Sequence, residues 1–176
     1  MLAARNAGCA MADESVEQTF KALLDGIGRK LGAQGFTKRG NAFRRVSSGN
    51  SAIVEVQRSQ SSASGAVRFT FNVGIICGRL LDEYQPDVSK AGSMHAHLRK
   101  RIGEFLPEPM DRWWDLDGTT EADDLVTELC SLLDVATRFL LDHANDAQLI
   151  ALWESGQSPG LTDGQRQRVL RELKAA

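Results

Sequence analysis

Cysteine is scarce in this chain of 176 residues, and its pattern excludes a disulfide scaffold or a zinc knuckle. The chain has three cysteines, an odd number: Cys9, Cys77 and Cys130. They lie far apart in the sequence and form no C-x-x-C pair. Cys77 ends an apolar run and Cys130 lies on an apolar helical stripe, so we expect both to be buried small hydrophobes and not nucleophiles. Free thiols of this kind indicate a reducing compartment.

Long hydrophobic segments are also missing, so the sequence predicts no transmembrane helix and no membrane partner. The run over residues 69–77, among the longest without a charge, is far shorter than the roughly 20 residues that a spanning helix needs. The first residues contain no apolar h-region and therefore lack the pattern of a secretory signal. We predict a cytoplasmic protein with a disordered extension over residues 1–12, which leaves both Met1 and Met11 as possible starts.

The common catalytic motifs are absent as well: the sequence has no G-x-S-x-G elbow, P-loop, dinucleotide fingerprint or H-E-x-x-H. Two weaker candidates leave a hydrolase-type enzyme open as an alternative. His95 and His97 would supply two metal ligands from one strand face, but no third ligand is evident. Asp115 and Asp117 have the spacing of an acid–base pair on a strand, although Asp117 also fits a turn before a helix. We expect no metal and no cofactor.

The residues that are present predict one α+β domain. A content of 42% hydrophobic and 25% charged residues is ordinary for a globular protein of this length. Apolar residues at steps of three and four from Val16 to Leu31 predict a helix capped by Asp13 or Ser15. Alternating residues over 35–48, 51–60 and 66–77 predict four strands of an antiparallel sheet with one buried face.

The second half of the chain predicts helices around one ambiguous segment. Residues 94–106 fit both a helix and a strand. Residues 119–144 predict a long helix capped by Thr119 or Thr120, and two short helices follow, the second with a capping box of Thr162 and Gln165. The expected fold is a single α+β domain over residues 13–145, with a curved antiparallel sheet of about five or six strands packed by the N-terminal and long helices. Short C-terminal helices over residues 146–176 are expected to pack on the same domain.

Several local motifs resemble one bacterial family. They are "GF-x-K-x-GN-x-F-x-R" (35–45), "VQRSQ" (56–60), "RFTFNVGI" (68–75), "HLRKRIGEFLP" (97–107) and "RWWDLD" (112–117). Together they resemble the bacterial domain-of-unknown-function family 4304 over roughly residues 15–145. The resemblance implies an α+β domain in which the "HLRKRIG" stretch pairs as a strand. It implies no established activity, cofactor or catalytic residue.

The charges are distributed unevenly along the chain. Residues 36–101 hold 11 Lys and Arg against 4 acids, a local net charge of +7, whereas residues 113–176 hold 5 against 12, a net charge of −7. In one interpretation the polar, basic face of the sheet binds an anionic partner. In the other, the acidic helices simply neutralise the basic strands.

We favour a non-enzymatic binding module whose partner is a protein. An anionic protein would match the basic charge of the sheet face. Nucleic acid is the less favoured partner, because Phe69 and Phe71 fall on the apolar face and leave no aromatic platform among the bases. The oligomeric state is left open. The expected binding residues are Arg58, Arg68, Thr70, Asn72, Arg99, Arg101, Trp113 and Trp114.

Trp113 and Trp114 raise a separate question because they are adjacent. If residues 112–116 form a strand, the two side chains must point to opposite faces of the sheet. One tryptophan is then expected in the core and the other at the surface, beside Arg99 and Arg101.

Overall fold

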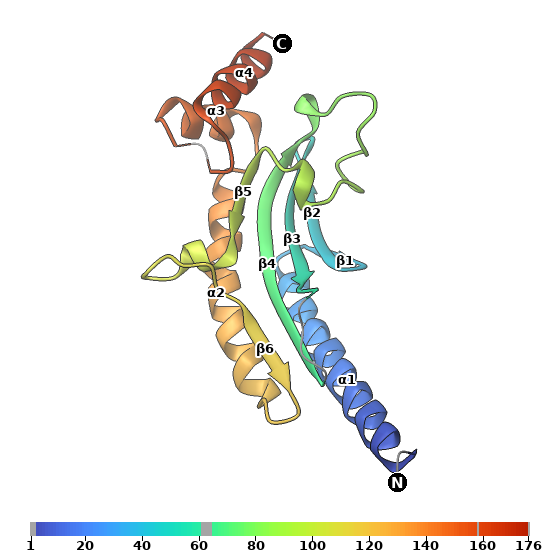
Figure 1. Ribbon diagram of the computed structural model, residues 1–176. Helices are drawn as coiled ribbons and strands as arrows, with labels where there is room; N and C mark the ends of the chain where they lie inside the picture. Colours follow the sequence, from blue (N-terminus) through green and yellow to red (C-terminus); the bar gives the residue numbers. More distant parts are fainter. Residues whose placement is uncertain (1–2, 61–64, 158, 176) are drawn as a thin grey trace.

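A computed structural model describes the backbone of residues 3–60, 65–157 and 159–175, and side chains from Glu14 onward. Its centre is a six-stranded antiparallel sheet in the order β1-β2-β3-β4-β5, with β6 pairing to β4 (Figure 1). The strands are β1 (Thr37–Arg39), β2 (Ala42–Ser47), β3 (Asn50–Arg58), β4 (Ala66–Cys77), β5 (Leu98–Arg101) and β6 (Trp114–Asp117). The helices are α1 (Ala3–Ala33), α2 (Ala122–Asp142), α3 (Asp146–Glu154) and α4 (Asp163–Lys174). The predicted α+β fold with an open, curved sheet is confirmed.

The long strand β4 organises the sheet. Along one edge it pairs with β3, and its other edge is divided between β5, opposite residues 72–75, and β6, opposite residues 66–69. Directly opposed residues of antiparallel strands point to the same face, so this register determines which side chains meet. Val54 opposes Val73 and Val56 opposes Phe71, which aligns the apolar positions of both strands on one face.

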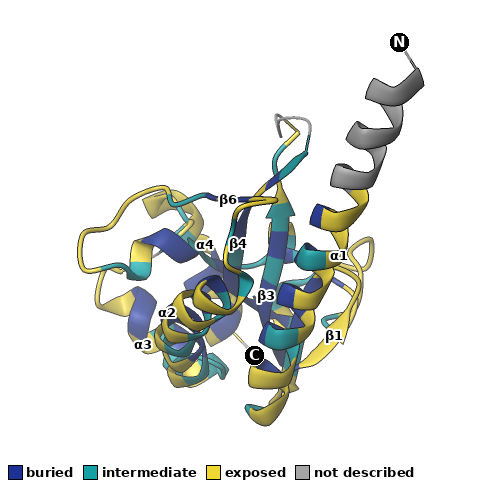
Figure 2. Ribbon diagram, turned by 90° about the horizontal axis from the view of Figure 1, so that it is seen from below, coloured by how far each residue is buried: buried dark blue, intermediate teal, exposed yellow. Residues whose placement is uncertain are grey.

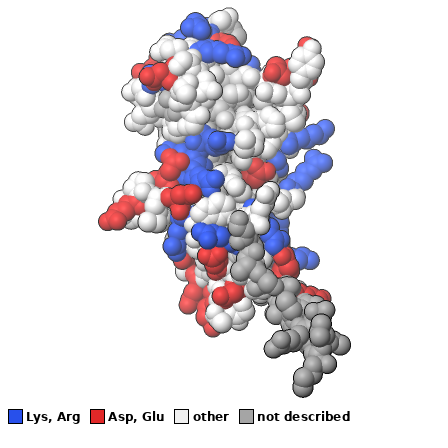
Figure 3. All heavy atoms as spheres, viewed as in Figure 1, with Lys and Arg blue, Asp and Glu red and all other residues white. Residues whose placement is uncertain are grey.

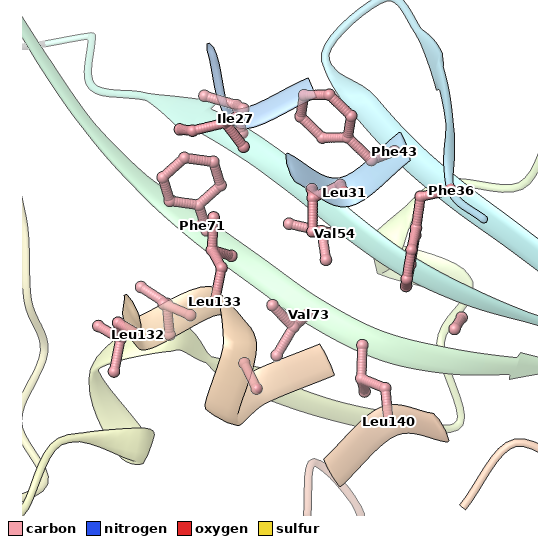
Figure 4. Packing of buried hydrophobic residues seen from close by; sticks show 14 of the residues in the cluster. Ile27, Leu31, Phe36, Phe43, Val54, Phe71, Val73, Leu132, Leu133 and Leu140 are labelled. Atoms are coloured by element: carbon pink, nitrogen blue, oxygen red, sulfur yellow. The ribbon is translucent and has the colours of Figure 1, made fainter. Parts of the chain in front are cut away.

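Helices α1 and α2 cover that apolar face. Figure 2 shows that α1 turns buried residues toward the sheet and exposed residues away from it. Ile27 and Leu31 of α1 and Leu133 and Leu140 of α2 are almost completely buried against the strands (Figure 4). Burial of a large aliphatic side chain stabilises a fold by about 1.5–3 kcal/mol, so this layer is a main source of stability.

A long connection covers one end of the opposite face. It runs from residue 78 to residue 97 and contains the short 3-10 helices η1 (Gly78–Leu80) and η2 (Ser93–His95). Ala91 packs with Ala42, Ile53 and Ile76 in a second, smaller apolar cluster. The cluster covers the outer face near β2 and the end of β4, whereas Arg68 and Asn72 farther along β4 keep solvent exposure.

The C-terminal helices share the main core. Leu149, Trp153, Leu170 and Leu173 are buried in the same cluster as α1, α2 and the sheet. The predicted capping box of α4 is confirmed, since Gln165 donates its backbone N–H to Thr162 Oγ1 and accepts from the Thr162 backbone N–H. No helix in the described part of the chain has the length and hydropathy needed to cross a membrane.

Two local expectations differ from the structure. Helical backbone begins at Ala3, not at Asp13 or Ser15, in keeping with the high helix propensity of the alanine-rich start. The expected disorder of residues 1–12 stays a prediction. The N-cap of α2 is Glu121, because Thr119 and Thr120 bond instead to Asp117.

The segment of residues 94–106, whose sequence fitted both a helix and a strand, contains a short piece of each. Residues 98–101 form β5 and residues 102–105 form the 3-10 helix η3 (Ile102–Phe105). The strand that the family resemblance implied is therefore present but short.

Candidate interaction surface on the sheet

Strand register decides which predicted binding residues meet. Arg68 and Asn72 of β4 point away from the core, because Phe69 and Phe71 between them point into it. Arg101 opposes Asn72 and Arg99 opposes Gly74, so both arginines of β5 lie on this same outer face. The structure thus brings Arg68, Asn72, Arg99 and Arg101 together from two neighbouring strands.

The adjacent tryptophans point to opposite faces, as predicted. Trp114 opposes Phe69, is 4% exposed, and stacks on Phe69 with ring centroids 6.1 Å apart. Its indole Nε1 donates a 3.0 Å hydrogen bond to Glu128 of α2. Trp113, by contrast, is only half-buried, and its ring lies beside Arg68 and Arg101 of the outer face.

The Trp113 ring lies between two guanidinium groups. The Arg101 guanidinium carbon is 5.2 Å from the ring centroid and that of Arg68 is 5.9 Å from it, within the range of cation–π attraction. Arg101 also forms an ion pair with Asp111 at 3.3 Å, and Arg68 lies 3.9 Å from Asp115. We call Arg68, Asn72, Arg99, Arg101 and Trp113 the Trp113 surface.

A groove of about 380 Å³ opens beside the Trp113 surface. Its lining includes Gln57, Asn72, Met94, Arg99, Arg101 and Glu104. Figure 3 shows Lys and Arg side chains gathered over β5 in the middle of this face, with Asp and Glu side chains next to them. The surface is therefore one of mixed charge with a cationic centre.

Three of the predicted binding residues do not belong to this surface. Arg58 opposes Phe69, which places it on the helix-covered face, where its guanidinium lies 5.1 Å from the Phe20 ring centroid and pairs with Glu17 of α1. Thr70 is on the outer face but is fully buried, because its Oγ1 donates a 2.8 Å hydrogen bond to the Arg112 carbonyl. Trp114 belongs to the core. The expectation that Arg58 lies on the polar face of the sheet was wrong. Thr70 lies on that face but is buried, and Trp114 is the tryptophan that was expected in the core.

Sequence reasoning also missed residues that complete the surface. Gln57 reaches the groove from β3 and accepts a 2.9 Å hydrogen bond from Asn72 Nδ2. The alternation along β3 already placed it on the outer face, so a signal was present. Met94 reaches the groove from η2 and Asp111 reaches Trp113 from a loop, and no local pattern indicates either contact.

The two aspartates proposed as an acid–base pair have separate structural roles. Asp115 opposes and approaches Arg68. Asp117 accepts hydrogen bonds from the hydroxyl and backbone N–H of Thr119, at 2.8 and 2.9 Å, and from the Thr120 hydroxyl. The hydrogen bonds from Thr119, the side-chain one first, lower the pKa of Asp117, whereas a general acid at neutral pH needs a raised pKa. The geometry is that of a turn before α2.

The two histidines do not share a strand face. His95 lies in η2, whereas His97 precedes β5 and accepts a 3.2 Å hydrogen bond at Nδ1 from the Cys77 backbone N–H. Burial lowers the pKa of His97, and the Leu80 carbonyl beside the ring opposes this shift only in part. Among the side chains that the structure describes, no group of three or more His, Cys, Asp and Glu could hold a metal ion.

The cysteines of the described core behave as small apolar residues. Cys77 is completely buried, and burial raises the pKa of its thiol to about 12. Cys130 is half-buried on α2, where burial also raises its pKa. Since the thiolate is the reactive form, neither environment activates a nucleophile.

Acidic helices neutralise part of the basic strand half. Lys38 of β1 pairs with Asp25 of α1 at 2.7 Å, and Arg79 of η1 pairs with Asp146 of α3 at 3.1 Å. Arg58 and Glu17 form a third pair of this kind. These contacts show that internal neutralisation accounts for part of the charge asymmetry.

The fold and the surface together define an α+β domain with an open antiparallel sheet, two helices on one face and a cationic, tryptophan-bearing patch on the other. The chain belongs to the family of the domain of unknown function DUF4304, whose model matches residues 27–143. This range begins inside α1 and ends just after α2, so α3 and α4 lie beyond it. No curated protein and no solved structure matches the chain.

Proposed function

We propose that this protein is a binding module and that a partner protein contacts the Trp113 surface. The observation that carries the proposal is the outward placement of Trp113 between Arg68 and Arg101, although its neighbour Trp114 is used for the core. Tryptophan and arginine are the residue types that most often dominate the binding energy of protein interfaces. A large ring held in place by two guanidinium groups is already ordered before a partner arrives, which reduces the entropic cost of binding.

Exposed methionines near the same surface support a protein partner. Met94, 78% exposed, lines the groove with Arg99, and Met110, 54% exposed, lies next to Arg101 in a neighbouring shallow depression. Methionine is enriched at interfaces, where its flexible side chain adapts to the partner. The combination of tryptophan, arginine and methionine is typical of the centre of a protein interface.

The charges favour protein over nucleic acid. Glu104, Asp111 and Asp115 lie among the arginines, and their carboxylates would repel a phosphate backbone. Proteins that bind single strands stack successive bases on several aromatic rings. Phe69, Phe71 and Trp114 lie in the core, so among these aromatic residues and Trp113 only Trp113 lies beside the arginines of the outer face.

Affinity capture with surface variants tests the proposal. The bait proteins are wild type, Trp113→Ala, Arg99→Glu and the control Arg138→Glu, which changes an exposed arginine of α2. A protein retained by wild type and by the control, but lost from both surface variants, is the expected result.

Two other outcomes would reject the proposal. Equal retention by all four baits would place the interface elsewhere. Retention that disappears after nuclease treatment would identify nucleic acid as the bound macromolecule. Circular dichroism of each variant establishes that the fold is unchanged.

A further inference from the structure

The groove beside Trp113 contains one guanidinium with no carboxylate partner. Lys100 Nζ lies 2.9 Å from Glu104 Oε2, and Arg101 Nη1 lies 3.3 Å from Asp111. Arg99 forms no ion pair with any carboxylate in the described part of the chain, and its nearest polar contact is Met94 Sδ at 3.2 Å. Within the described residues, the half-buried Arg99 therefore has no carboxylate to neutralise its charge.

The groove as a whole favours an anion. Two guanidinium groups of the outer face, those of Arg99 and Arg101, line it against the single carboxylate of Glu104. Lys100 opposes Val73 and is a lining residue whose ammonium group pairs with Glu104. Both oxygens of that carboxylate are occupied, one by Lys100 and the other by the Arg101 backbone N–H at 2.9 Å. Glu104 is thus paired with Lys100 and the Arg101 backbone, and it forms no ion pair with Arg99.

From these contacts we infer that the groove binds a carboxylate from an acidic side chain of the partner, seated on Arg99. This inference rests on the proposed function, because it names the chemical group that the partner presents next to Trp113. A carboxylate matches the two parallel N–H groups of one guanidinium. Asn72 and Gln57, bonded to each other, also line the groove and add amide groups to it.

A carboxylate suits the groove better than a phosphate group. A phosphate carries nearly two negative charges at neutral pH, but Arg99 is the one guanidinium of the groove that is not already paired with a carboxylate of the described residues. Glu104 and Asp111 would repel the second charge. Met94 at the rim offers an apolar contact to the methylene groups of an acidic side chain.

Arginine side-chain NMR on the purified full chain tests the inference without any partner. The probes are N-acetyl-glutamate amide, the uncharged N-acetyl-glutamine amide and inorganic phosphate. We expect the glutamate probe to shift the Arg99 Nε–Hε resonance saturably, and the glutamine probe to leave it unchanged. Arg99→Gln should weaken glutamate binding at least 10-fold, whereas the matched change Arg138→Gln should not alter it.

Three other outcomes of this experiment would overturn the inference. Absence of saturation by glutamate overturns the inference, and so does phosphate binding more tightly than glutamate. Equal binding to wild type and Arg99→Gln would also overturn it. The proposed function can fail independently of this inference. If glutamate saturates Arg99 but partner capture does not depend on Trp113, the anion site stands and the partner surface is rejected. If Trp113→Ala abolishes capture but glutamate does not saturate Arg99, the partner surface stands and the anion site is rejected.

Discussion

At the scale of single residues, Trp113 and Trp114 offer a direct comparison of core and surface. We expect Trp114→Ala to lower the free energy of unfolding by about 3–5 kcal/mol, because it empties a site enclosed by Phe69 and Phe71. Trp113→Ala should cost less than about 1 kcal/mol, since its ring is only half-buried and its contacts are exposed ones to Arg68, Arg101 and Asp111. Urea unfolding measures both values. Similar losses for the two variants would show that the register of β6 is wrong.

Gly74 lies where β4 and β5 approach too closely to leave room for a Cβ atom. A Cβ there would lie 2.4 Å from the Leu98 carbonyl oxygen and 2.8 Å from Ala96 Cβ, so Gly74→Ala must push β5 away from β4. We expect a loss of about 1–3 kcal/mol in the free energy of unfolding.

The matched control for Gly74→Ala is Gly118→Ala. A Cβ at Gly118 meets no atom within 4 Å, so its cost should stay within about 0.5 kcal/mol. Guanidinium unfolding of both variants provides the comparison. Equal stability of Gly74→Ala and wild type would contradict the close approach of the two strands.

Some of the surface residues could be predicted from sequence, and others could not. The period of two along β4 correctly placed Arg68 and Asn72 opposite Phe69 and Phe71. The same period from Val56 would have placed Arg58 on the core side, where its long side chain reaches past Phe20 to Glu17. The burial of Thr70 depends on a loop carbonyl 42 residues away, which no local pattern contains.

At the scale of elements, a small polar network attaches α3 to the sheet. Asp146 accepts hydrogen bonds from Asn50 Nδ2 at 2.9 Å and Arg79 Nη1 at 3.1 Å, and from the Cys77 thiol at 3.4 Å. Burial raises the pKa of Asp146, but these three hydrogen bonds together outweigh it, so its pKa lies below the ordinary value. The ionised carboxylate therefore stabilises the folded state.

This network predicts a pH-dependent effect of Asp146→Asn. A carboxylate with a lowered pKa contributes its stability above the unfolded pKa of about 3.9, and loses it as the pH falls through the folded value. The variant should be less stable than wild type at pH 7, and the difference should narrow below about pH 4. Urea midpoints at pH 7 and pH 3 measure this change, with Asp142→Asn, an exposed position, as the control. A difference that stays constant would exclude the ionised carboxylate as its cause.

Element boundaries were predictable where one period continued for long enough. The alternation of β4 gave both of its ends, whereas residues 94–106 mixed two periods because a short strand passes directly into a 3-10 turn. The start of α2 was misplaced for a different reason. Thr119 and Thr120 are good caps, but Asp117 competes successfully for their hydroxyl groups.

At the scale of the whole molecule, the core extends beyond the part that the family model matches. Helices α3 and α4 follow residue 143, yet Leu149, Trp153 and Leu170 are buried against the same strands and helices as the rest of the core. The segment before α4 also contacts β5, since the Arg99 backbone N–H donates a 3.1 Å hydrogen bond to the Pro159 carbonyl. The tail therefore stabilises the strand that carries the cationic centre of the Trp113 surface.

Removing residues 145–176 tests this dependence. The truncation loses several fully buried side chains worth about 1.5–3 kcal/mol each, a sum comparable with the total stability of about 5–15 kcal/mol of a typical domain. We expect a markedly lower unfolding temperature, loss of a cooperative transition, and weaker carboxylate binding at Arg99 because β5 loses its contact with Pro159. Calorimetry of the truncated and full chains measures the first two effects.

Trp153→Ala in the full chain should reproduce part of the destabilisation while leaving the Pro159 contact, and hence carboxylate binding, intact. A truncated chain that unfolds within a few degrees of the full one would show that α1, α2 and the sheet form a complete core without the tail.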